Sequence, residues 1–204
     1  MATLIKPPIE WAVAELAQQG QSESGDRYLA LSTADGGLVA AVDGLGHGAE
    51  AASAAKIAVR ALERGANRPL VQLLRDCHQS LIGTRGAVVS AAAFAWRTET
   101  MTWLGVGNVE GVLLRAPASG GARIETLLVR GGVVGVHLPP LAAEVVSIRR
   151  GDTLILATDG VRSGFLDGTL PYLPPQELAD HVLARWGTPT DDALVLVVRY
   201  LGPA

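Results

Sequence analysis

Short apolar runs recur along this chain, many of them rich in Val, Leu and Ala, and Gly, Pro, Asp or Thr residues separate them. Runs of this length and composition predict buried β-strands. Residues 10–17 fit a short strand or a helix equally well. We expect strands at the following ranges: 28–33, 37–43, 87–96, 101–106, 111–116, 123–129, 144–150, 152–159 and 193–201.

The first two of these runs form a predicted hairpin, because only Ala34-Asp35-Gly36 separates them. An Asp-Gly pair is typical of hairpin turns, and we expect its glycine to supply the positive φ that such turns need. The second strand then delivers Asp43 to a glycine-rich bend.

Three segments carry helix signals. Residues 49–65 are rich in Ala, the strongest helix former, and Gly65 marks the expected end of that helix. Residues 69–82 and 174–186 both begin with proline, which the first turn of a helix tolerates. Strands and helices follow one another in runs, without strict alternation. This order predicts an α+β fold with mostly antiparallel sheets.

Length and composition narrow the class of protein. The chain has 204 residues, 49% of them hydrophobic, and no linker or repeat divides it, so we expect a single domain over residues 1–204. The net charge is −3, and no block of Lys or Arg stands out. We therefore expect no nucleic-acid partner.

Cysteine usage and the apolar runs bear on the compartment. Cys77 is the only cysteine, so no disulfide can form within the chain, and we expect a small packing residue in a protein of the reducing cytoplasm. No apolar run approaches the roughly 18 residues that a membrane-spanning helix needs. The amino terminus also lacks a basic and then apolar signal, so we expect no membrane association.

Acidic residues mark the ends of several buried strands. Asp43-Gly44 and Asp159-Gly160 end long apolar runs, and Asp191-Asp192 begins another. A buried carboxylate is costly unless it is paired or bound to a metal. Asp43, the carbonyl of Gly44, Asp159 and one of Asp191 or Asp192 offer only oxygen ligands, which suit Mg²⁺ or Mn²⁺ rather than zinc. Asp-Gly is also a common turn dipeptide, and we interpret Asp35-Gly36 as a turn.

The loop Gly44-Leu45-Gly46-His47-Gly48 leads directly into the first predicted helix. Its glycines permit positive φ values and a close approach to an ion or phosphate. The loop is neither a Walker A motif nor GxGxxG, so it gives little support to ATP binding. His47 fits a proton donor or a group beside the metals, and it fits a solvent-facing loop residue equally well.

The order of these motifs resembles a known family. Gly25-Asp26, the segment AAVDGLGHGAEAA, the segment ILATDGVRSGF and the terminal DDALVLVV resemble the metal-dependent type 2C (PPM) serine/threonine protein phosphatases, and more closely their bacterial SpoIIE-like branch. The resemblance covers about residues 20–200. The length, Arg85-Gly86-Ala87 and Val106-Gly107-Asn108-Val109 are similar to the stand-alone stressosome phosphatases of that branch.

The resemblance implies a fold and a function. The fold would be a four-layer αββα sandwich, with two mostly antiparallel sheets flanked by helices. The activity would be hydrolysis of phosphoserine or phosphothreonine, with two Mn²⁺ or Mg²⁺ ions. The partners would be phosphorylated regulatory proteins of a bacterial stress pathway, either a stressosome scaffold or an anti-sigma antagonist.

The resemblance also implies roles for single residues. Asp43 would bridge the two ions, and Gly44 would offer its carbonyl to one of them. Asp159 and Asp191 would complete the shell of the other ion, with Asp191 preferred to Asp192. Asp26 would hold a metal-bound water or bind a metal weakly. Catalysis would therefore depend on Asp43, Asp159 and Asp191.

Two positions depart from the family pattern. Leu194 stands where the last motif usually has Ser or Thr, so the hydrogen bond of that hydroxyl is missing. Arg162 stands where many relatives have an acidic or other polar residue, which bears on whether a third metal binds. Arg162, Arg27 and Arg85 are candidates for gripping the substrate phosphate, because Arg can bind phosphate through two hydrogen bonds.

Two functions from different classes follow. The first is the phosphatase, supported by the complete set of acidic positions. The second is a module with the same fold that binds phosphoproteins with little catalysis, supported by the altered last motif. Metal-dependent turnover of a phosphoserine substrate distinguishes the two.

Overall fold

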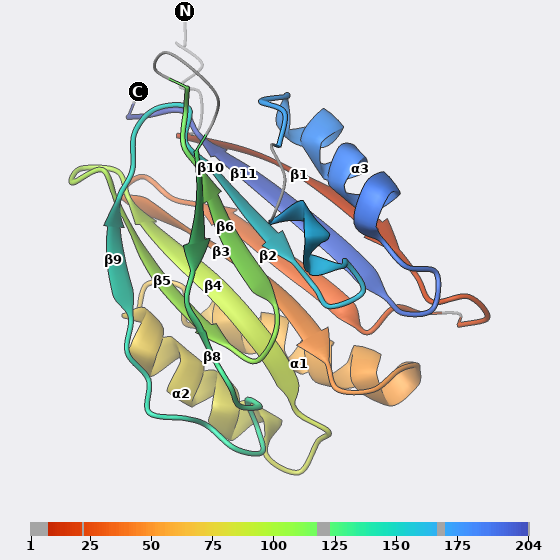
Figure 1. Cartoon of the computed structure of the whole chain (residues 1–204). Coiled ribbons are helices and arrows are strands. Elements are labelled where there is room, and N and C mark those ends of the chain that lie inside the picture. The colour runs from red at the N-terminus through yellow and green to blue at the C-terminus, as the bar shows by residue number, and fades with distance from the viewer. Residues whose placement is uncertain (1–7, 22, 118–122, 167–169, 204) are drawn as a thin grey trace, which may run out of the picture.

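The computed structural model describes residues 8–21, 23–117, 123–166 and 170–203. Within these residues it contains three α-helices and two β-sheets stacked face to face, as Figure 1 shows. The predicted α+β class and the four-layer αββα arrangement are confirmed. No helix in these ranges is long and apolar enough to cross a bilayer.

The first sheet, sheet A, has the strand order β1-β11-β10-β6-β7, and every neighbouring pair is antiparallel. Residues 10–17, which fitted strand or helix, lie almost entirely in the edge strand β1. The strands of sheet A are β1 (Ile9–Leu16), β6 (Glu110–Leu114), β7 (Ile124–Leu127), β10 (Thr153–Ala157) and β11 (Ala193–Tyr200).

The second sheet, sheet B, has the strand order β2-β3-β4-β5, and both β8 and β9 pair with the outer edge of β5. Among the strand pairs of the described residues, only the short β5–β8 pair is parallel. The strands of sheet B are β2 (Asp26–Ser32), β3 (Gly36–Gly44), β4 (Ala87–Ala95), β5 (Thr100–Val106), β8 (Val129–Arg130) and β9 (Glu144–Ser147).

The helices cover the outer faces of the sheets. Helices α1 (Ala49–Arg64) and α2 (Leu70–Leu81) lie on sheet B, and α3 (Pro175–Trp186) lies on sheet A. Central strands such as β10 and β11 are therefore buried on both faces, which explains their continuous apolar sequences. The α1 face that meets sheet B consists largely of alanine, and these small side chains let the helix approach the sheet closely.

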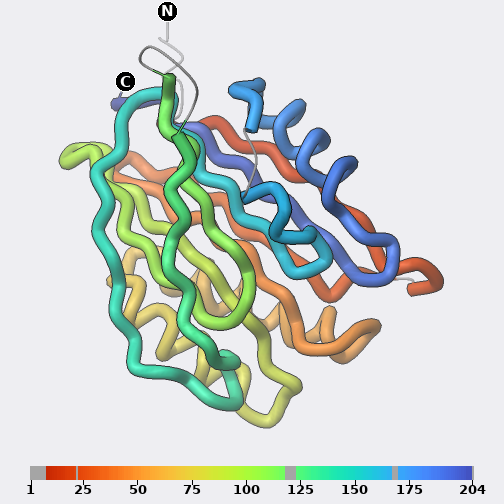
Figure 2. The backbone as a smooth tube through the Cα atoms, viewed as in Figure 1, coloured from red at the N-terminus to blue at the C-terminus, as the bar shows by residue number. Residues whose placement is uncertain are grey.

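Two local predictions need correction. Residues 123–129 were expected to form one strand, but β7 joins sheet A and β8 joins sheet B, with Leu128 between them. Figure 2 traces this crossing from β7 through β8 to β9. Gly36 does not have the predicted positive φ. It is required instead because a Cβ at this position would collide with the carbonyl oxygen of Phe94 on β4.

Candidate metal centre

Sheet pairing brings distant acidic residues to one end of the sandwich. Asp26 on β2 and Asp43 on β3 are direct partners across the antiparallel pair. Asp159 follows β10 and Asp191 precedes β11, and these two strands are antiparallel neighbours. The end of one strand therefore lies beside the beginning of the other. Four carboxylates that are far apart in the sequence thus meet at the same end of the sandwich.

Three of these carboxylates line one pocket. A cavity of about 580 Å³ is bordered by Asp43, Asp159 and Asp191. The rest of its wall comes from several loops and strand ends: Gln18, Leu45, Gly46, His47, Val88, Gly107, Asn108 and 131–133. Asp26 lies deeper and is only 2% exposed.

The electrostatics of this site are unfavourable to a set of charged carboxylates. Burial raises the pKa of Asp26 to about 7 and that of Asp43 to about 8, and the neighbouring carboxylates add to both shifts. The pKa of Asp159 is also raised, by burial first and by the charge of Asp191 second. Like charges at close range disfavour ionisation, so this region gains stability from any bound positive charge.

Asp191 and Asp192, which the sequence left as alternatives, occupy different environments. The Asp192 carboxylate accepts hydrogen bonds from the backbone N–H groups of Gln18 at 2.8 Å and Gly25 at 2.7 Å. It is 4% exposed and ties the segment before β2 to the start of β11. Asp191 lines the pocket, and one of its oxygens accepts the local N–H of Asp192 at 2.9 Å.

A buried threonine on the core side of the site hydrogen-bonds one of the acidic residues. The Thr158 hydroxyl donates to the Asp26 carboxylate at 2.6 Å and accepts the backbone N–H of Leu194 at 2.8 Å. Leu194, which replaces the hydroxyl residue of the last motif, is fully buried in the core between the sheets. Thr158 thus connects the first, third and last motifs in the absence of a hydroxyl at position 194.

The glycines of both Asp-Gly motifs are required by close backbone contacts. A Cβ at Gly44 would collide with the carbonyl oxygen of Ala51 in α1. A Cβ at Gly160 would collide with the carbonyl oxygen of Asp192. Each glycine therefore lets its motif lie against another part of the site, which sets the position of the adjacent aspartate.

The donor chemistry of the pocket fits a hard cation. The carboxylates of Asp43, Asp159 and Asp191 are oxygen ligands, which Mg²⁺ and Mn²⁺ prefer, whereas Gly44 does not line the pocket. Among the residues described, no three His, Cys, Asp or Glu side chains form a compact ligand set around a single point. The fit therefore rests on the shared pocket and on the mutual repulsion of its carboxylates.

The other predicted site residues are divided between the pocket and its surroundings. His47 lines the pocket with an exposed ring, and its Nδ1 lies 3.4 Å from Nε2 of Gln21. Gly46 and Gly48, on either side of it, have the expected positive φ values of 86° and 75°.

The three arginines do not line the pocket. Arg27 binds Glu23 at 2.9 Å and the carbonyl of Ser24 at 2.8 Å. Arg85 pairs with Glu50, and Arg162 donates to the carbonyl of Arg185 at 3.3 Å. Backbone and acidic groups near in space thus engage the guanidinium groups that were candidates for phosphate.

Sequence reasoning missed the two amide side chains of the pocket, Asn108 and Gln18. Asn108, in the turn after β5, donates from Nδ2 to the Asp159 carboxylate at 2.9 Å. Gln18 donates from Nε2 to the carbonyl of Thr190 at 2.9 Å. The pair Gly107-Asn108 was a usable signal, because Gly107 has a φ of 109° and Asn is a frequent turn residue that can also bind a carboxylate.

Comparison with known proteins gives one matching family and several relatives. Residues 34–201 match the family described as stage II sporulation protein E (SpoIIE). A curated relative, phosphoserine phosphatase RsbX of Bacillus subtilis (strain 168), is 27% identical over 194 residues, which cover 95% of each chain.

Two solved structures are also similar to this chain. A chain from work on the bacterial stressosome is 31% identical, with a TM-score of 0.83, and the alignment covers 94% of this chain and 99% of that one. RsbX in complex with magnesium is 21% identical, with a TM-score of 0.82 and 94% of each chain covered. The family model spans most of the sequence, so this chain belongs to the SpoIIE family.

Proposed function

We propose that this chain is a metal-dependent protein serine/threonine phosphatase. The observation that carries the proposal is the convergence of Asp43, Asp159 and Asp191 in one pocket, with Asp26 buried behind them. Family membership and the similarity to a relative named phosphoserine phosphatase support the same activity. The reaction is hydrolysis of a phosphate monoester on a Ser or Thr side chain.

Two divalent cations, Mn²⁺ or Mg²⁺, are the proposed cofactors. Asp43 would hold both ions, the Gly44 carbonyl would add to the shell of one, and Asp159 and Asp191 would hold the other. Asp26 serves as an outer carboxylate, and Asp192 has a structural role because two backbone N–H groups occupy it. When bound, such ions activate a water molecule and neutralise charge on the phosphoryl group.

The chain's own residues hold this arrangement in place. Asn108 fixes the Asp159 carboxylate from the pocket side, and Thr158 fixes the Asp26 carboxylate from the core side. Both orient an oxygen that a cation can use, which lowers the cost of assembling the site. His47 lies at the pocket with an exposed ring, where it can exchange a proton with the leaving Ser or Thr oxygen.

The proposed substrates are phosphorylated regulatory proteins of a bacterial partner-switching pathway, of the stressosome scaffold or anti-sigma antagonist type. Similarity to RsbX and to a chain from work on the bacterial stressosome supports this substrate class. We place the protein in the cytoplasm, since its single thiol, Cys77, is free and buried in the core of α1, α2 and sheet B.

The direct test measures release of phosphate from a phosphoserine peptide with and without Mn²⁺. We expect turnover that requires the metal and that Asp159→Asn abolishes. Asp35→Asn is the matched control, because Asp35 also precedes a glycine but lies exposed in a hairpin turn away from the pocket. Tight binding of the peptide without turnover would favour the phosphoprotein-binding module instead.

A further inference from the structure

Exposed apolar side chains continue from the pocket onto the neighbouring surface. We call Ile82, Val133 and Val136 the apolar shelf. Ile82 is 58% exposed and Val136 is 63% exposed, whereas Val133 is half-buried and lines the pocket beside the acidic residues. Ile82 follows directly after α2, and the two valines lie between β8 and β9. Apolar surface that adjoins a polar pocket is typical of a binding site.

Close packing holds the two valines together and places their segment against the end of α2. A Cβ at Gly86 would lie 2.7 Å from Cγ1 of Val133 and 3.0 Å from Cγ2 of Val136, so both valines rest on the Gly86 backbone. A Cβ at Gly135 would lie 2.6 Å from Cβ of Leu81, the last residue of α2. The segment between β8 and β9 therefore lies directly against the end of α2, at the residue before Ile82.

Hydrogen bonds hold the shelf in one conformation. Ala87 and Val134 exchange backbone hydrogen bonds of 3.0 and 2.8 Å, and Val133 and His137 do the same at 2.8 and 2.9 Å. The Gly135 N–H donates to Nδ1 of His78 on α2 at 2.8 Å. A preorganised surface binds a partner without the cost of ordering its own loop.

We propose that the apolar shelf binds the polypeptide that flanks the phosphorylated residue of a protein substrate. This inference rests on the proposed phosphatase function, because it needs the phosphoseryl side chain in the acidic pocket. The main chain of that residue then lies at the pocket mouth, where Val133 leads to Val136 and Ile82. An extended segment advances about 3.3 Å per residue, so an apolar side chain a few positions away reaches the shelf.

The chemistry of the shelf selects apolar rather than charged neighbours of the phosphoserine. Arg85, which precedes Gly86, already pairs with Glu50. Binding thus depends on apolar area removed from water, and two polar substitutions on the shelf should weaken it without changing the acidic pocket.

The test compares two phosphoserine peptides in the presence of Mn²⁺. One has Leu or Ile at three to five residues on each side of the phosphoserine, and the other has Ser at the same positions. We expect the wild-type protein to show a KM about tenfold lower for the apolar peptide, with similar kcat. Ile82→Ser/Val136→Ser should remove this preference and leave kcat/KM for p-nitrophenyl phosphate unchanged.

The matched control is Leu128→Ser/Val145→Ser. Leu128 and Val145 are each 66% exposed and do not line the pocket, so this variant should retain the peptide preference. Equal KM values for both peptides in a wild-type protein that hydrolyses p-nitrophenyl phosphate would overturn the shelf proposal alone. Failure to hydrolyse p-nitrophenyl phosphate and both peptides would instead overturn the phosphatase proposal, and the shelf proposal with it.

A second copy of the chain is the competing occupant of the shelf. Sedimentation velocity of the wild type and the shelf variant distinguishes this case. A dimer that Ile82→Ser/Val136→Ser dissociates would assign the shelf to self-association and overturn the substrate role.

Discussion

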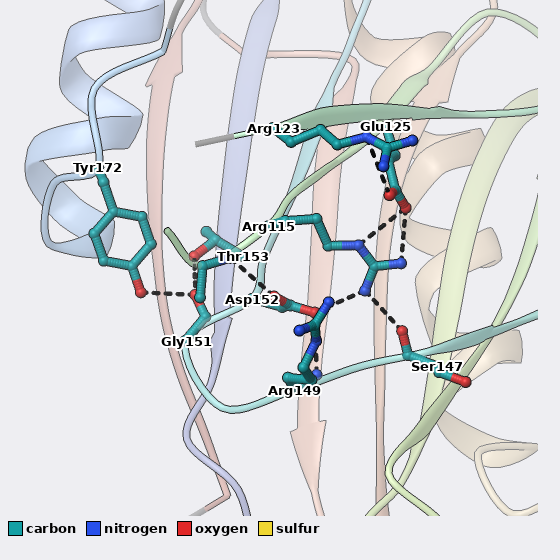
Figure 3. Close-up of polar contacts among 10 residues, drawn as sticks. Arg115, Arg123, Glu125, Ser147, Arg149, Gly151, Asp152, Thr153 and Tyr172 are labelled. Carbon is teal, nitrogen blue, oxygen red and sulfur yellow. Dashed lines mark hydrogen bonds and ion pairs between the residues drawn. The ribbon is translucent and has the colours of Figure 1, made fainter. Parts of the chain in front are cut away.

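Strand β10 has an aspartate near each end, and the two carboxylates have opposite electrostatic surroundings. Before the strand, Asp152 is 2% exposed and binds Arg115 at 2.7 Å. The backbone N–H groups of Ala116 at 2.9 Å and Arg149 at 3.0 Å donate to the same carboxylate. Figure 3 shows this network, in which Arg115 also binds Glu125 at 2.7 Å.

At the other end of β10, Asp159 faces carboxylates instead of a guanidinium group. Its described polar side-chain partner is the neutral Asn108, and Asp191 raises its pKa. Asp26 is buried and Asp43 half-buried near it, and burial raises their pKa values to about 7 and about 8. The protein's charges thus compensate one end of the strand and leave the other end with excess negative charge.

The difference separates structural from functional carboxylates. A buried carboxylate that already binds an Arg and backbone N–H groups is stabilised within the folded chain and needs no further positive charge. Carboxylates that repel one another at close range are stabilised when a cation binds among them. The burial of an aspartate alone therefore does not show whether it is structural or functional. The charges of the groups around it do.

Removing a carboxylate from the acidic end should have the largest effect, and on activity rather than on folding. Asp43→Asn should lower kcat/KM by about a thousandfold or more, because charge that stabilises the transition state is lost. The metal-free variant should unfold at the same temperature as the wild type or higher, since a buried repulsion is relieved. Phosphate release and thermal unfolding in EDTA measure the two effects. A lower unfolding temperature with retained activity would contradict the comparison.

Breaking the compensated end should have the reverse pattern. Arg115→Met leaves Asp152 buried without its charged partner and should lower the free energy of unfolding by about 3 kcal/mol. The kcat/KM of the folded variant should change less than about twofold, because the network lies at the far end of β10. Urea unfolding measures the first effect.

The double variant Arg115→Met/Asp152→Asn tests the origin of that loss. It removes both charges and should recover part of the stability. A double variant as unstable as Arg115→Met would indicate lost packing of the arginine stem rather than an unpaired acid.

The pH dependence of stability should also differ between the two ends. Asp26 and Asp43 have raised pKa values in the folded protein, so the metal-free protein binds more protons than the unfolded chain between about pH 4 and 8. The free energy of unfolding in EDTA should therefore fall by about 4 kcal/mol from pH 6 to pH 8. Asp26→Asn/Asp43→Asn should flatten this dependence.

The compensated end loses stability in the opposite direction. The hydrogen bond from Arg115 lowers the pKa of Glu125 below its ordinary value of 4.5. Its contribution is thus present above the ordinary pKa and lost only as the pH falls through the folded value. Urea unfolding at pH 3–5 of the wild type and Glu125→Gln measures this loss.

The outcome that would contradict the assignment of the acidic end is a free energy of unfolding of the metal-free protein that rises from pH 6 to pH 8.

The smallest expected effect concerns the neutral partner of Asp159. Asn108→Ala should raise the Mn²⁺ concentration needed for half-maximal activity about tenfold, because a group that orients a proposed ligand is lost. Asn67→Ala is the control, since Asn67 is exposed in the connection between α1 and α2. A change in kcat without a change in metal requirement would show that Asn108 acts on the substrate instead.

Local sequence signals predicted most elements of the fold. Continuous apolar runs marked β10 and β11, because strands covered by a sheet on one side and helices on the other need no polar face. The alanine-rich segment and Gly65 predicted α1 closely, since helix propensity and the end signal are properties of neighbouring residues. The split of 123–129 into β7 and β8 was missed because the choice between two sheets depends on partners far away.

The acidic residues of the candidate site were predictable from the sequence, but the separate role of each one was not. Asp43, Asp159 and the pair Asp191-Asp192 stand out as acids at the ends of apolar runs. The contact of Asp192 with the N–H groups of Gln18 and Gly25 joins residues more than 160 positions apart, and no local pattern carries it. The same reason hid Asn108, which meets Asp159 only because β6 pairs with β10 in sheet A, in the register that places Glu110 opposite Ala157.

The sequence by itself determined the strands and helices, the family, and the set of acids available for a cation, because each depends on residue type and short-range order. The tertiary structure alone decided which acids are compensated and which are not. Asp152 and Asp159 both adjoin the same short strand, yet Arg115 reaches one and three further carboxylates surround the other. Charge compensation depends on distances through space, which only the folded chain defines.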